Sequence, residues 1–340
     1  QIPDSEGDLY KSACAWVNGR FHVVWSRFEE DDWDLWTASY DGSDWTKPVP
    51  LTEEPGADVE PAMAARGNTA VLVWQGTRRS HSDIFLRILT PDGWQPTRAV
   101  TEADGNDWMP QVAVGPNGEI GMAWDSYRNG DYDLYARVLR DGAFEPEVPV
   151  AASERFEAYG TVTVDPAGRV WIAYEEGTEN WGKDQGSTVP RPQPGTRLYS
   201  RRVVRVRVLH NGALFEPAVQ PAAAVPQGHN RRFHEKPRLH ADPAGRIWLC
   251  LRWSMRTMRY LRRRGHYRFS KAWESYVTRY DGNTWAEPMP LPRSIARLDT
   301  YAVPCPLPDG SVAAVWHTDS RTTDDIRKPV KNRVVAAFLP

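Results

Sequence analysis

The stretch QVAVGPNGEIGMAWDSYRNGDYDLYARVLRDGAFEPEVPV spans residues 111–150 and decides the fold. Short apolar runs are separated by the pairs Asn117-Gly118 and Asp141-Gly142, and an aromatic residue and a proline follow the second pair. Asn-Gly and Asp-Gly are strong hairpin signals, because both residues tolerate positive φ. The stretch therefore predicts four antiparallel strands, at 111–114, 120–124, 132–139 and 144–150.

The second of these strands has counterparts along the whole chain. Their last residues are 49, 50, 50, 77 and 65 positions apart. A period near 50 built of short strands and turns is typical of β-propeller blades. We therefore expect an all-β protein, a six-bladed β-propeller with four antiparallel strands in each blade. The corresponding apolar runs are residues 21–25, 70–74, 120–124, 170–174, 247–251 and 312–316.

The repeats predict one propeller domain over residues 1–340. The sixth repeat stops after its third strand, and Gln1-Ile2-Pro3 resembles the end of a fourth strand. The N-terminus is thus expected to complete that blade and protect its edge. Three residues cannot form the whole strand, so we expect upstream sequence and leave a seventh blade open. The expected blades lie near residues 1–52, 53–102, 103–152, 153–222, 223–293 and 294–340.

Charge is divided unevenly along the chain, although the net charge is only −2. Residues 1–160 carry 28 acidic and 13 basic side chains, whereas residues 161–340 carry 16 acidic and 29 basic ones. Attraction between the halves would explain this division, as would a basic surface for an acidic sugar, a polyanion or an acidic partner domain. No run approaches the roughly 20 apolar residues of a membrane-spanning helix. Cys14, Cys250 and Cys305 fall in predicted strands and are expected to be free, buried thiols.

The face that carries the site follows from strand order. The loops between the second and third strands lie at the same end of the blades as the loops that join one blade to the next. The loops at this end are the long ones. Residues 175–198 and 252–271 are insertions on that end, where binding usually sits. From Arg246 to Lys271 the chain has eight arginines, one lysine and no acidic residue. Such a block can bind carboxylates or sulfates. The acidic first half of the chain disfavours binding of nucleic acid.

Polar and aromatic residues gather at the same end in the predicted topology. They suit a carbohydrate, while the alternative is that they hydrate a central channel. The candidate catalytic residues are Glu175, Glu176, His234, Asp299, Tyr301, His317 and Asp319. The candidate ligand-binding residues are Glu60, Asp107, Trp108, Tyr159, Trp181, Arg252, Trp253 and Arg256. No metal or cofactor motif is present, and we expect neither.

A repeated Arg–Asp pair is interpreted as structural. Arg78 with Asp83, and Arg128 with Asp133, are predicted to pair across the loop between the second and third strands. A catalytic residue is needed only once, so repetition favours architecture. The fourth and fifth repeats depart from this pattern, and such departures are where function is expected.

The repeat pattern resembles sialidase-like and TolB-like propellers. Thr278 to Trp285 and Tyr40 to Trp45 occupy the turn that holds the Asp-box in sialidases, but they lack the residue between Asp and Gly. The order of residues 180–184, 199–209, 273–276 and 316–319 is similar to propeller modules that precede PHP-type metal-dependent hydrolase domains in secreted bacterial proteins. This resemblance implies a secreted or periplasmic protein.

Two functional hypotheses follow. The first is a recognition or scaffold propeller that binds an acidic glycan or an adjacent domain of the same protein. The alternative is a glycan-active enzyme. A glycoside hydrolase would use paired carboxylates, and a polysaccharide lyase would use Tyr301 or His234 as base, with arginines neutralising a uronate carboxylate.

Overall fold

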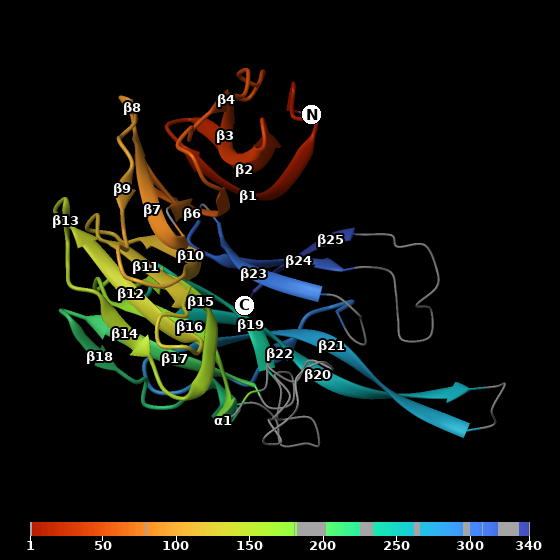
Figure 1. Ribbon diagram of the computed structural model, residues 1–340. Helices are drawn as coiled ribbons and strands as arrows, with labels where there is room; N and C mark the ends of the chain where they lie inside the picture. Colours follow the sequence, from red (N-terminus) through yellow and green to blue (C-terminus); the bar gives the residue numbers. More distant parts are fainter. Residues whose placement is uncertain are drawn as a thin grey trace, which may run out of the picture. The chain divides into compact units, whose positions relative to one another are not determined.

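In the computed structural model the chain is a six-bladed β-propeller of small antiparallel sheets with almost no helix, as predicted (Figure 1). The structure describes residues 2–78, 80–179, 181, 202–224, 234–261, 266–294, 300–307, 309–318 and 333–339, without the side chains of 255–261, 266–272 and 300. Its contacts divide the chain into two compact units, each described by itself. Unit 1 is Gln1–Ser153 with Glu157–Val164, and unit 2 is Glu154–Phe156 with Asp165–Pro340.

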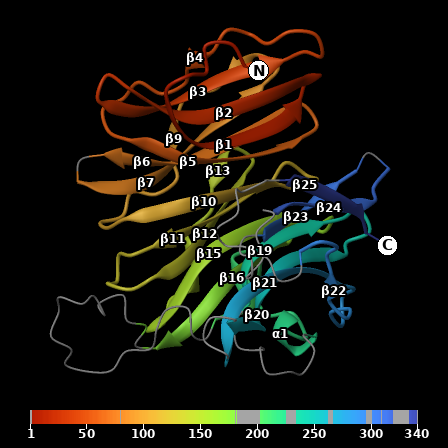
Figure 2. The same cartoon turned by 90° about the vertical axis from the view of Figure 1, so that its right-hand side faces the viewer.

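Unit 1 contains the first three sheets, whose strands lie side by side in chain order (Figure 2). The short strands β9 and β14 pair with the third strands of their sheets. The first sheet comprises β1 (Asp8–Val17), β2 (Arg20–Glu29), β3 (Asp32–Tyr40) and β4 (Val49–Pro50). The second comprises β5 (Asp58–Arg66), β6 (Thr69–Arg78), β7 (His81–Thr90), β8 (Gly93–Trp94) and β9 (Arg98–Ala99). The third comprises β10 (Asp107–Val114), β11 (Ile120–Ser126), β12 (Asp133–Arg140), β13 (Ala143–Phe144) and β14 (Val148–Ala151).

The later sheets follow the same order. The unit boundary falls inside β15, the first strand of the fourth sheet. The fourth sheet comprises β15 (Arg155–Val164), β16 (Val170–Glu179), β17 (Val203–His210) and β18 (Ala213–Phe215), followed by the helix α1 (Pro221–Ala224). The fifth comprises β19 (His234–Ala241), β20 (Ile247–Leu261), β21 (His266–Tyr280) and β22 (Met289–Pro290). The sixth comprises β23 (Thr300–Pro306), β24 (Val312–Thr318) and β25 (Arg333–Phe338). No helix in these described ranges is long and apolar enough to cross a membrane.

Burial explains the apolar second strands. Every residue of β11 is buried, and the tryptophans Trp74, Trp124, Trp248 and Trp316 of the second strands are among the largest fully buried side chains. The outer strands are shorter than predicted. The strand expected at 144–150 is divided into β13 and β14, because Pro146 lies between them and has no N–H to donate to the ladder.

A bulge recurs in the first strands. At each bulge a residue other than glycine has a positive φ. Lys11, Glu60, Met109 and Lys236 have this φ at a shift in strand register, and Tyr159 of the fourth sheet also has a positive φ. Such a conformation costs roughly 1–2 kcal/mol for an L-residue. Its recurrence indicates that a bulge at the start of the first strand is part of the blade architecture.

Two expectations about the frame are wrong. Arg78 and Arg128 pair with Asp58 and Asp107 on the first strands, at 2.9 and 2.8 Å, and not with Asp83 or Asp133. The reason is register: Asp58 is opposite Gly76 across the sheet, two residues before Arg78. Ile2 and Pro3 belong to no strand, and the sixth sheet has three strands among the described residues. All three cysteines are free, as expected, but only Cys250 is buried: Cys14 is exposed and Cys305 is partly exposed, so the expectation of burial is wrong for these two.

Candidate active site

The insertion of the fifth sheet is a regular hairpin. The strands β20 and β21 pair residue for residue from Ile247 opposite Tyr280 to Leu261 opposite His266, and they extend well beyond their neighbours in unit 2 (Figure 1). Residues 252–261 contain neither glycine nor proline, so nothing interrupts the pairing. The predicted loop insertion is therefore a two-stranded arm. Of the matching insertion of the fourth sheet, residues 175–198, the structure describes 175–179 and Trp181.

Four charged side chains form a buried chain at the base of this arm. Glu175 on β16 accepts a hydrogen bond from Arg202 at 2.5 Å, and Arg202 Nη1 lies 3.9 Å from Glu235 on β19. Glu235 in turn accepts a hydrogen bond from Arg252 Nε on β20, at 2.6 Å. All four are less than 10% exposed. Buried charges survive only when paired in this way, and removing one partner is expensive.

Glu175 also holds the bulge of the fifth sheet. Its Oε1 accepts the backbone N–H of Lys236 at 2.8 Å, and Lys236 has a φ of 55°. Asp125, at the corresponding place on β11, accepts the N–H of Tyr159 at 3.0 Å, and Tyr159 has a φ of 58°. Burial raises the pKa of Glu175, against the lowering effect of Arg202. The repetition gives Glu175, a predicted catalytic residue, a structural role.

Aromatic rings contact Arg252, the last of these four linked charged residues. The Arg252 guanidinium carbon lies 4.3 Å from the ring centre of Trp273 on β21 and 4.4 Å from that of Tyr301 on β23. Tyr301 stacks on His317 of β24, with centroids 5.0 Å apart and an interplanar angle of 29°. Three sequence candidates, Arg252, Tyr301 and His317, are therefore brought together.

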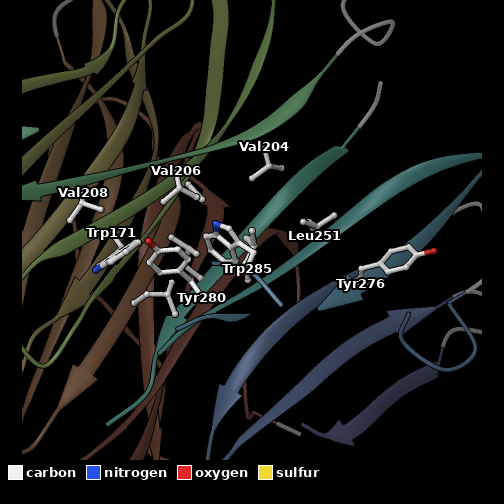
Figure 3. Close-up of a cluster of buried hydrophobic side chains, with 12 residues drawn as sticks. Trp171, Val204, Val206, Val208, Leu251, Tyr276, Tyr280 and Trp285 are labelled. Carbon is white, nitrogen blue, oxygen red and sulfur yellow. The ribbon is translucent and has the colours of Figure 1, made fainter. Parts of the chain in front are cut away.

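A second stack involves Trp253, the next residue of β20, whose side chain points to the opposite face of the sheet from that of Arg252. The Trp253 ring stacks on Tyr276 at 3.9 Å and 14°, and His234 lies 5.8 Å from it. The Tyr276 hydroxyl donates to Glu274. Burial and this carboxylate raise the pKa of Tyr276 above its usual value. Tyr276 lies at one end of an apolar cluster in unit 2 (Figure 3).

Other predicted residues have separate partners. Glu176 accepts hydrogen bonds from Arg205, and Trp181 packs edge-on against Phe156. Four candidates belong to unit 1. Glu60 accepts a hydrogen bond from the Tyr10 hydroxyl, and Asp107 forms an ion pair with Arg128. Trp108 packs against Tyr127 and Tyr132, and the backbone N–H of Tyr159 donates to Asp125. Asp299 and Asp319 lie outside the described residues, as does the side chain of Arg256.

The sequence candidates did not include Arg202, Glu235, Trp273, Glu274 and Tyr276. Arg202, Glu235 and Trp273 have partners on other strands, so spacing along the chain carries no signal for them, whereas Glu274 and Tyr276 are bonded to each other two residues apart on β21. The one available signal was the pair His234-Glu235 at a first-strand start, where other blades carry a carboxylate, as at Asp58 and Asp107. No group of histidine, cysteine and acidic side chains that could hold a metal occurs among the residues described.

These features describe a six-bladed propeller with charged and aromatic clusters in unit 2. No protein-family model matches the sequence, and no curated protein matches it either. Its fold is similar to a family PL25 ulvan lyase bound to a glucuronate–sulfated rhamnose unit: TM-score 0.59, 12% identity, covering 96% of this chain and 81% of that one. It is also similar to an α-L-arabinofuranosidase of Fusarium graminearum, with a TM-score of 0.53 and 13% identity, covering 98% of this chain and 95% of that one. A third similar structure is Trypanosoma rangeli sialidase, with a TM-score of 0.50 and 10% identity, covering 93% of this chain and 53% of that one.

Proposed function

We propose that the protein is a glycan-active enzyme that cleaves an acidic polysaccharide by β-elimination at the site formed by Arg252, Tyr301 and His317. The observation that carries this proposal is the stacked Tyr301–His317 pair with a buried guanidinium 4.4 Å from the tyrosine ring. Two proton-transferring side chains and a fixed positive charge are the groups that elimination from a uronate requires.

The reaction needs one base and one acid. His317 takes the proton on the carbon beside the uronate carboxylate, and the electron pair left behind forms a carbon–carbon double bond. The glycosidic carbon–oxygen bond breaks, and the Tyr301 hydroxyl supplies a proton to the leaving oxygen. Arg252, oriented by Glu235, stabilises the negative charge that develops during these steps.

Elimination is better supported than hydrolysis. A glycoside hydrolase uses two carboxyl groups that face the sugar. Glu175 and Glu235 are buried and occupied by arginines. One structural neighbour is a lyase whose bound ligand contains glucuronate, and uronate is the sugar that β-elimination requires. Such polymers lie outside cells, so we propose an extracellular protein.

The test is incubation of the full chain with ulvan and with glucuronan, following the ultraviolet absorbance of the conjugated unsaturated uronate. Tyr301→Phe and His317→Gln should each lower turnover by about a hundredfold or more, the usual contribution of a general acid or base. Tyr127→Phe in unit 1 is the matched control and should keep full turnover. Absence of product from every uronate polymer offered would contradict the proposal.

A second candidate is recognition without cleavage, favoured by the basic arm. Residues 255–272 contain seven basic and no acidic residues, and they could hold an acidic glycan or an adjacent domain, of which a PHP-type hydrolase domain is one candidate. In the same experiment this function predicts retention of the polymer with no unsaturated product.

A further inference from the structure

Unit 2 has a cavity at the other end of its blades, where the tight turns lie. Its volume is about 380 Å³, and it opens between the fourth and fifth sheets. Tyr280 lines it, four residues along β21 from Tyr276 of the candidate active site, or about 13 Å at 3.3 Å per residue. Tyr276 lies at one end of an apolar cluster, and Tyr280 lies away from it, beside Trp171 (Figure 3). The volume is in the range of small-ligand sites.

The floor of the cavity is rigid and apolar. Trp171 and Tyr280 lie 5.6 Å apart and are each 4% exposed. Their polar atoms are already used: Trp171 Nε1 donates to Asp165 at 2.8 Å, and the Tyr280 hydroxyl donates to the carbonyl of Gly282 at 2.9 Å. The floor therefore offers ring surface and no competing hydrogen bonds.

One wall is an aromatic ring with an open face. Phe215 on β18 is 53% exposed. Its counterpart in the third sheet, Phe144, is covered by the guanidinium groups of Arg98 and Arg137, at 4.4 and 4.6 Å. The outer aromatic of the fifth sheet, Trp285, is 4% exposed. Phe215 is thus the exposed member of this set, and a ring face open to water is where a flat apolar surface can stack.

The polar groups of the cavity favour an anion. Arg169 is anchored on Asp165 through Nε at 2.6 Å, and its side chain remains 45% exposed. His210 Nδ1 is buried, and no hydrogen bond reaches it among the described residues. The one acidic lining residue, Glu216, is engaged by Arg207 at 3.1 Å. A carboxylate on the ligand would pair with the exposed guanidinium of Arg169.

We propose that this cavity is a second sugar-binding site, which takes a hexuronate ring with its face on Phe215 and its carboxylate on Arg169. The choice of an acidic sugar rests on the proposed function, but the cavity and its polar groups do not.

The experiment is calorimetric titration of the full chain with glucuronate, and with glucose as the neutral counterpart. Arg169→Gln should weaken glucuronate binding about tenfold or more, the loss expected for a charge-assisted hydrogen bond. Phe215→Ala removes the stacking surface and should weaken binding as well. The matched control is Arg246→Gln. Arg246 is held by Asp242 at 2.6 Å in the equivalent turn of the fifth sheet and does not line the cavity.

Equal weakening by Arg169→Gln and Arg246→Gln, or equal affinity for glucose, would overturn the assignment. So would a crystal soaked in glucuronate that shows no sugar against Phe215. These outcomes are separate from the elimination test. Binding lost in Arg169→Gln, with no unsaturated product from any polymer, would leave this site standing and remove the proposed reaction.

Discussion

A buried carboxylate that supports a strained backbone is hard to tell from a catalytic one by sequence. Glu175 satisfies both Arg202 and the N–H of Lys236. Replacing it with alanine leaves both without this acceptor, so Glu175→Ala should lower the free energy of unfolding by about 3 kcal/mol. Glu175→Gln keeps an oxygen for Lys236 and should cost less. Urea unfolding measures both variants.

The parallel series at Asp125 is the control. Asp125→Ala should also destabilise, because Tyr159 loses the acceptor of its N–H, and Asp125→Asn should again cost less. If Glu175→Gln unfolded like the original protein yet lost all turnover on uronate polymers, Glu175 would be catalytic and the structural assignment would be wrong.

Asp133 should make stability depend on pH. Burial raises its pKa to about 6, although Asn129 donates a hydrogen bond to it. A carboxyl group whose pKa is higher in the folded state stabilises the fold while protonated. Its contribution is therefore full below the unfolded-state pKa, near 4, and is lost as the pH rises through about 6. Asp133→Asn, which stays neutral, should gain about 3 kcal/mol over the original protein at pH 7.5 and nothing at pH values near 3.

Chemical unfolding of Asp133→Asn and the original protein at the two pH values checks this expectation. The exposed Asp104→Asn is the control and should show the same difference from the original protein at both. A constant effect of Asp133→Asn across the pH range would show that the folded and unfolded carboxyl groups titrate alike.

At the scale of elements, local signals predicted most of the frame. The turn pairs Asn117-Gly118 and Asp141-Gly142 and the apolar run ending at Trp124 locate β10 to β13, since turn chemistry and burial are written in neighbouring residues. Pairs across the sheet were not predictable in this way. Arg128 is nearer in sequence to Asp133 but binds Asp107, because the ladder brings the first strand alongside it. For the same reason the link from Arg252 to Trp273 and Tyr301 appears only in three dimensions.

The arm formed by β20 and β21 should be separable from the blade. The strand β19 covers β20 only as far as Trp253, so the residues beyond it form a two-stranded ribbon, which adds little stability alone. Replacing residues 255–272 with Asn-Gly, between the paired Ser254 and Trp273, should change the unfolding midpoint little. Capture of immobilised glucuronan at low salt should fall about tenfold or more.

A full-length variant with glutamine at the seven basic positions of 255–272 separates charge from shape. It should lose the same capture while keeping the arm. Retention of full capture by this variant would show that the basic residues of the arm do not hold the polymer.

At the scale of the whole molecule, charge and site chemistry divide along the chain. The first 160 residues are acidic and the remainder basic. The unit 1 candidates have partners in their own unit, such as Arg128 for Asp107 and Tyr10 for Glu60. Both proposed sites belong to unit 2. A uronate polymer should therefore bind unit 2 and leave unit 1 unchanged.

Hydrogen–deuterium exchange of the full chain with glucuronan tests this division. A ligand that binds the folded state stabilises it by mass action, which slows exchange where opening would release the ligand. Slower exchange is expected in peptides from β16 to β21 and from β23 and β24, which carry the residues of the two proposed sites, with none in β1 to β12. Because exposed charge interactions are screened within about 10 Å at 0.1 M salt, the protection should shrink as salt is raised. Protection of β5 and β10, or protection indifferent to salt, would place the polymer on the acidic unit and remove both proposed sites.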